Sequence, residues 1–162
     1  MLRNEPIKII VHHTADSTLG PQFGKVDNYH KQRGFILSSY GYYVGYHYFI
    51  ERDGTVKQAR KLTDEGCHTI GENTQSIGIC LAGNFDFDIP TKQQKLSLEK
   101  LTDELAITYK IPIERVVGHR THSKTSCPGR NLSDDIPRWG LYKKELDRLT
   151  RILWELFRKI GL

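Results

Sequence analysis

Cysteine is scarce in this chain, and long apolar runs are missing. Its 162 residues include three cysteines, Cys67, Cys80 and Cys127. An odd and low count argues against a disulfide framework, although it leaves one bridge between Cys67 and Cys80 open. No stretch is long and apolar enough to cross a membrane as a helix. The sequence therefore indicates neither a disulfide-stapled scaffold nor a membrane-spanning protein.

The first residues also lack a secretory leader. The apolar run near the start is short and is interrupted by Lys8. We therefore expect the protein to be made in a cytoplasm, without a targeting signal in its own sequence. No internal repeat, low-complexity stretch or linker divides the sequence, so we expect a single domain over residues 1–162.

The composition is that of a folded globular protein with a positive excess. Hydrophobic residues make up 38% and charged residues 27% of the chain. The formal net charge of +5 favours an anionic partner such as nucleic acid, anionic lipid or a bacterial wall polymer. No base-reading motif accompanies this charge, so we expect no nucleic-acid partner.

Short apolar runs alternate with helical patterns, which predicts an α/β fold. We expect strands at 7–12, 75–85 and 115–119 and a hairpin that turns at Asp53-Gly54. Helices are expected at 24–34, at 91–110 with Thr91 as its cap, and at 141–162. The central sheet should be mixed, with about five to six strands flanked by helices. The last helix is amphipathic, and we expect it to pack its apolar stripe on the domain rather than on a membrane.

The polar loop "GHRTHSKTSCPGR" (118–130) raises the question of what Cys127 does. A catalytic zinc site needs three protein ligands and leaves one position open. His12 or His13, His119 and Cys127 could supply them, since imidazole and thiolate suit Zn²⁺. Two other interpretations stay open on spacing alone. Cys127 could be an inert buried thiol, or a nucleophile that uses a neighbouring histidine as its base.

Four stretches line up in order with one known family: "IIVHHTA", "VGYHYFIERDGTV", "GCHTIGENTQSIGICLAGNF" and "VVGHRTHSKTSCPGR". The chain resembles the type 2 N-acetylmuramoyl-L-alanine amidases, which are zinc enzymes related to peptidoglycan recognition proteins and short phage amidases. The matching segments run from about residue 9 to residue 130. The resemblance implies a zinc cleft on one side of the sheet. It also implies endolysin-like hydrolysis of the amide between N-acetylmuramic acid and L-alanine.

The resemblance further implies roles for individual residues. It makes His12, His119 and Cys127 the zinc ligands. It makes Tyr46 a catalytic residue close to the zinc-activated water. It places Thr125 beside the reaction centre, where the hydroxyl would donate to the oxyanion.

Other positions are interpreted from the same comparison. The resemblance implies that His68 and Asn73 line the substrate groove. Cys80 stands where some members of the family carry a catalytic Glu, which leaves no obvious carboxylate base. We expect His30 to lie on the surface. The remaining histidines should either support the zinc ligands or be structural: His13, His47 and His122.

These interpretations predict a monomeric enzyme that acts on peptidoglycan of the bacterial cell wall, through phage-type release or wall recycling. The main alternative is a recognition module that binds peptidoglycan without cleaving it. Recognition proteins that have lost activity typically lack the cysteine ligand, so Cys127 favours an enzyme. A Cys–His hydrolase is the third possibility.

Overall fold

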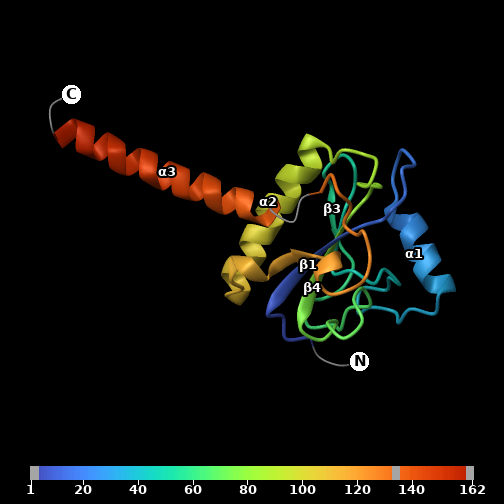
Figure 1. The fold of residues 1–162 in the computed structure, drawn as a ribbon. Coiled ribbons are helices and arrows are strands. Elements are labelled where there is room, and N and C mark those ends of the chain that lie inside the picture. The colour runs from blue at the N-terminus through green and yellow to red at the C-terminus, as the bar shows by residue number, and fades with distance from the viewer. Residues whose placement is uncertain (1–3, 133–135, 160–162) are drawn as a thin grey trace.

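The chain folds around one mixed sheet (Figure 1). The computed structural model describes residues 4–132 and 136–159, with side chains described for 4–132 and 148–159. The sheet has five strands in the order β3-β2-β4-β1-β5. Only β3 runs antiparallel to its neighbour. The strands are β1 (Lys8–His13), β2 (Tyr48–Ile50), β3 (Val56–Gln58), β4 (Ser76–Leu81) and β5 (Val116–Gly118).

The two central strands, β4 and β1, carry the most apolar runs of the sequence. Every residue of β4 is buried, as predicted for a strand covered on both faces. β1 begins and ends one residue later than expected, and its last five residues are buried. The hairpin prediction is confirmed, because β2 and β3 pair antiparallel around the turn that contains Asp53 and Gly54. Gly54 has a φ of +86°, a conformation that glycine adopts without strain.

Helices cover the two faces of the sheet. On one face lies α2 (Lys92–Tyr109), whose Leu98, Leu101 and Leu105 join the main apolar core. Thr91 caps this helix, and the capping box with Gln94 confirms the predicted start. On the other face lies α1 (Phe23–Gln32), beside a smaller apolar cluster (Figure 1). Two short 3₁₀ turns, η1 (Ile113–Arg115) and η2 (His119–Thr121), flank β5.

The last helix departs from the prediction. α3 (Ile136–Lys159) begins earlier than expected, contacts α2, and then extends away from the domain (Figure 1). Its apolar stripe between 148 and 159 does not pack on the domain, because each of its large apolar side chains is exposed: Leu149, Ile152, Leu153, Leu156 and Phe157. An amphipathic pattern shows that one face is apolar, but it does not specify which surface covers that face. None of the described helices is long and apolar enough to cross a membrane.

His30 is buried, so its predicted surface position is wrong. Only 7% of the residue is exposed. Its Nδ1 accepts a hydrogen bond from the backbone N–H of Gly45 at 3.0 Å, and its ring stacks on Phe35. Burial, and then the charge of Arg60, lower the pKa of His30 to about 4. The loop from Phe35 to Gly45 covers this face of α1. The helical pattern of the sequence does not predict that a loop buries this face.

Candidate metal centre

Two parallel strands bring the first two candidate ligands together. β1 and β5 are neighbours, so their carboxyl ends lie at the same edge of the sheet. His12 lies near the end of β1, and His119 follows β5 directly. The loop after His119 then folds back, because the N–H of Arg120 donates to the carbonyl of Cys127 at 2.8 Å. Segments that are more than a hundred residues apart in the chain therefore meet at one point.

The side chains of His12, His119 and Cys127 form the one cluster with metal-ligand geometry among the described residues. Their candidate ligand atoms all lie within 4.8 Å of one another. Nδ1 of His12 lies 3.7 Å from Sγ of Cys127. Tetrahedral zinc with ordinary Zn–N and Zn–S bonds would separate two such atoms by about 3.6 Å. All three cysteines are free thiols, so Cys67 and Cys80 form no disulfide bridge and the Cys127 thiol is available as a ligand.

Burial keeps this cluster uncharged before a metal binds. Burial, then the nearby His68 and His119, hold the pKa of His12 well below its usual value. Burial and then His122 lower the pKa of His119. Burial raises the pKa of the Cys127 thiol to about 12. Neutral imidazoles are the form that coordinates metal, whereas the thiol must release its proton when the metal binds.

The surroundings of Cys127 suit a metal-bound thiolate. The backbone N–H of His13 points at its sulfur, with N and Sγ 3.5 Å apart. A peptide N–H in this position stabilises negative charge on sulfur. Two imidazoles and one thiolate form a donor set that favours Zn²⁺ over hard cations. The residues present therefore fit a zinc ion, with one coordination position left for water or substrate.

Tyr46 lies against the donor cluster. Its ring centroid is 5.0 Å from that of His12. Tyr46 also packs against the buried cluster that contains Cys80, the residue that replaces a carboxylate in some members of the resembled family. Burial, and then Cys80, raise the pKa of Tyr46 well above its usual value. Tyr46 therefore presents a neutral hydroxyl next to the candidate metal centre.

A cleft opens beside the cluster and contains both predicted groove residues. Its volume is about 500 Å³. His119 lies on the same wall, which places the cleft next to the donor cluster. Its other lining residues include Ile36, Cys67, His68, Ile70 and Asn73. Whether His68 and Asn73 contact substrate stays a prediction.

Thr125 lies on the exposed turn that precedes Cys127. Its Oγ1 accepts a hydrogen bond from the backbone N–H of Cys127 at 3.2 Å. The Thr125 side chain thus supports the turn that carries the cysteine, while its hydroxyl proton stays available for donation. Its role as an oxyanion donor stays a prediction.

The other histidines predicted to be structural have protein partners outside the cluster. Nδ1 of His13 accepts from the N–H of Phe85, and Nδ1 of His47 accepts from the N–H of Gly78. Nδ1 of His122 lies 3.2 Å from a carboxylate oxygen of Glu72. Because side chains alternate along a strand, His12 and His13 point to opposite faces of the sheet. Only His12 of this pair therefore joins the donor cluster.

Arg60 organises the cleft wall, a role that no sequence pattern predicts. The residue is completely buried. Its guanidinium donates to the carbonyls of Val44 and Ile36, each at 2.7 Å, and of Glu65 at 3.2 Å. One side chain thereby ties together three loop segments around the cleft. A charged residue just after a strand is usually a surface residue, so only the fold reveals this function.

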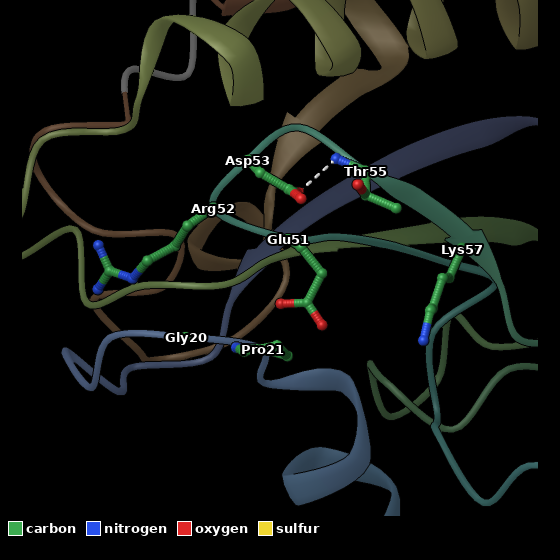
Figure 2. A pocket seen from close by; sticks show the side chains of 7 residues that line it. All are labelled: Gly20, Pro21, Glu51, Arg52, Asp53, Thr55 and Lys57. Carbon is green, nitrogen blue, oxygen red and sulfur yellow. Dashed lines mark hydrogen bonds between the residues drawn. The ribbon is translucent and has the colours of Figure 1, made fainter.

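A second cavity, of about 320 Å³, lies by the β2–β3 hairpin (Figure 2). Its charged side chains do not converge, since Glu51, Arg52 and Lys57 point in different directions in Figure 2. Both carboxylate oxygens of Glu51 accept backbone N–H groups at the start of α1, from Gln22 and Phe23. Glu51 is therefore a helix cap, and the cavity has no convergent set of functional groups.

Known proteins are similar to this chain in sequence and in fold. The family model described as N-acetylmuramoyl-L-alanine amidase matches residues 2–130. An endolysin of Klebsiella phage KP32 is 32% identical over 143 residues, which cover 85% of this chain and 87% of that protein. The solved structure of the amidase LysC from Clostridium intestinale URNW has a TM-score of 0.74 at 34% identity, covering 86% of this chain and 87% of LysC.

A further solved structure shows recognition proteins of similar fold. It is a complex of the peptidoglycan recognition proteins LCa and LCx with bound tracheal cytotoxin, at a TM-score of 0.69 and 28% identity. The match covers 86% of this chain and 87% of the matched one. The similar proteins therefore include both enzymes and recognition proteins.

Proposed function

Because this chain belongs to the N-acetylmuramoyl-L-alanine amidase family, we propose that its amidase activity depends on zinc held by His12, His119 and Cys127. Enzymes at 32% and 34% identity over most of the chain establish that it is an amidase. The observation that carries the zinc proposal is the cluster of two imidazoles and a thiol. Its spacing and chemistry suit a catalytic zinc site with one open position.

The substrate that we propose is peptidoglycan, cleaved at the amide between N-acetylmuramic acid and L-alanine. The family description supports this bond, and the recognition proteins that bind tracheal cytotoxin support a muropeptide ligand. The net charge of +5 also suits an anionic wall polymer. The cleft beside His119 offers a surface on which a stem peptide could lie.

Each residue near the cleft has a defined task in this proposal. A zinc ion held by His12, His119 and Cys127 would supply the Lewis acid that polarises the amide carbonyl and activates water. His12 and His119 remain neutral and present lone pairs, while the Cys127 thiol gives up its proton. The Tyr46 hydroxyl stays protonated and serves as a hydrogen-bond donor to the reacting oxygen. Thr125 offers a second hydroxyl donor from the turn before Cys127.

The other two candidate functions make different demands on Cys127. A Cys–His hydrolase needs a thiolate nucleophile and hence a lowered thiol pKa. The pKa of Cys127 is instead raised to about 12 by burial, which disfavours that mechanism. A recognition module that only binds peptidoglycan needs no cysteine in the cluster. The complete donor set therefore favours the enzyme, although similar proteins include recognition proteins.

Digestion of purified cell wall tests the proposal. Mass spectrometry of the fragments should reveal free L-alanine amino termini and intact N-acetylmuramic acid, with about one zinc per molecule in the same sample. A chelator should abolish cleavage, and added zinc should restore it. Cleavage that resists chelation but stops on thiol alkylation would instead identify a cysteine hydrolase. Wall binding without new amino termini would identify a recognition module.

A further inference from the structure

The ring of His68 lies in a slot that two glycines make possible. A Cβ built on Gly78, in the middle of β4, would lie 2.5 Å from Cδ2 of His68. A Cβ on Gly66 would lie 2.5 Å from the same atom. Real Cβ atoms do not approach so closely, so any larger residue at either position would displace the ring. The fold therefore fixes where the His68 ring stands.

A chain of hydrogen bonds begins at a backbone carbonyl and passes through this ring. The carbonyl oxygen of Glu72 can only accept, so the hydroxyl of Ser76, at 2.7 Å, must donate to it. The oxygen of Ser76 then accepts from Nε2 of His68, at 3.4 Å. Neutral imidazole carries one proton, so Nδ1 of His68 is left as an acceptor.

The chain ends at the candidate metal ligand. Nδ1 of His68 lies 3.1 Å from Nε2 of His12. Because Nδ1 of His68 accepts, Nε2 of His12 must carry the proton of that ring. The opposite nitrogen, Nδ1 of His12, then presents its lone pair, and this is the atom 3.7 Å from Sγ of Cys127. The chain is anchored at the carbonyl of Glu72, and it leaves an acceptor nitrogen of His68 facing Nε2 of His12.

We propose that His68 is a positioning residue that locks His12 in the metal-binding tautomer and ring orientation, through the relay Glu72–Ser76–His68–His12. The inference rests on the proposed zinc function. It assigns His68 a task different from the substrate contact that the resemblance implies. His68 acts here through His12 and need not touch substrate.

Two neighbours reinforce the relay. The side-chain oxygen of Asn73 accepts the backbone N–H groups of both His68 and Thr69, each at 2.9 Å. Asn73 thereby holds the loop in the conformation that directs His68 at His12. The hydroxyl of Thr69 lies 3.1 Å from Nδ1 of His68, to which it can donate, and 3.5 Å from Nε2 of His12, from which its oxygen can accept. Asn73 thus acts on His12 indirectly, because it positions the backbone of His68.

Zinc affinity, measured by competition with a chromogenic chelator, tests the proposal in the full-length protein. His68→Leu removes the acceptor and should weaken zinc binding by about 10- to 100-fold, the usual cost of losing a residue that orients a metal ligand. His68→Asn places a carbonyl oxygen near the position of Nδ1 and should restore most of the affinity. Ile70→Ala, on the exposed rim of the same cleft, is the matched control and should leave affinity unchanged.

The tautomer of His12 can be measured directly, without metal or substrate. Long-range ¹H–¹⁵N spectra of the metal-free protein should show His12 protonated at Nε2 in the wild type and in His68→Asn. In His68→Leu, and more so in His68→Leu combined with Thr69→Val, His12 should lose this preference. Far-ultraviolet circular dichroism checks that the variants fold. If His68→Leu is unfolded, Ser76→Ala, which frees the far end of the relay, should give a smaller loss of affinity.

The outcomes separate the competing roles. A His68→Leu variant with wild-type zinc affinity and an unchanged His12 tautomer overturns the proposal. If that variant also shows a raised KM for muropeptide, His68 is a substrate contact instead. If the wild type binds zinc but cleaves no wall, the proposed function fails, while the affinity and tautomer comparisons still decide the role of His68.

Discussion

Cys127 carries the sharpest residue-level prediction. Cys127→Ser replaces a zinc-binding thiol by a hydroxyl that is rarely a zinc ligand. We expect bound zinc to fall below one tenth of stoichiometric and amidase activity to disappear, as measured by metal analysis after dialysis and by release of amino termini. The variant should keep the circular dichroism of the metal-free wild type. A folded variant with a full complement of zinc would refute the assignment of Cys127.

Tyr46 separates metal binding from chemistry. Tyr46→Phe keeps the ring against His12 but removes the hydroxyl, so zinc should remain bound. Turnover should fall about 100-fold, within the range for loss of one positioned proton donor. Parallel metal analysis and kinetics on soluble muropeptide measure the two effects. Full activity in this variant would show that the hydroxyl takes no part in the reaction.

The candidate metal ligands could be predicted from the sequence, whereas the hydrogen bonds that orient them could not. The ordered resemblance selected His12, His119 and Cys127, and the structure brings these three side chains together. The hydrogen bond between His12 and His68 joins residues 56 positions apart, and no local pattern encodes it. The burial of His30 likewise depends on a loop that follows its own helix. Local spacing reports periodicity, but long-range hydrogen bonds appear only in the fold.

At the scale of elements, two helices with apolar stripes behave differently. The stripe of α2 is buried against the sheet, and the described part of the α3 stripe is exposed. The sequence gives both helices the same kind of periodicity, so it predicts their existence but not their packing. The sequence predicts the burial of the strands more reliably than the packing of these helices. A continuous apolar run such as "SIGICL" needs cover on both faces, which only a central strand provides.

Truncation of α3 tests its contribution to stability. Removing residues 148–162 deletes exposed side chains over the described range 148–159. We therefore expect the free energy of unfolding to change by no more than about 0.5 kcal/mol, as for other surface changes. Urea denaturation followed by circular dichroism is the measurement, since fluorescence would also register the loss of Trp154. A loss of several kcal/mol would mean that the stripe packs on the domain after all, as the sequence alone suggested.

For the whole molecule, buried histidines predict how stability depends on pH. Burial lowers the pKa of His30 and His47 to about 4, from a usual value of 6.5. Between pH 6.5 and 4 the unfolded chain binds more protons than the folded one, so the stabilisation is complete above pH 6.5 and is lost as the pH falls toward 4. Each histidine should contribute on the order of 3 kcal/mol over this window.

Urea denaturation of the zinc-free protein at pH 7.0, 6.0 and 5.0 measures this dependence, because it separates histidine protonation from metal release. His30→Gln removes one titrating group but keeps an acceptor for the N–H of Gly45, and it should flatten the slope. The pKa values of His12 and His68 are also lowered, mainly by burial, and these shifts add to the effect. Stability that rose on acidification through this window would contradict the assignment.

The placement of the three thiols gives the molecule a built-in reporter. Cys80 and Cys127 are buried, whereas Cys67 is partly exposed and lines the cleft next to His68. With zinc holding Cys127, a maleimide dye should therefore attach to a single site without any engineered substitution. The dye would sit where a stem peptide is expected to enter, so its emission would change as ligand binds. Occupancy of the cleft could then be followed in real time, even in a variant that no longer cleaves.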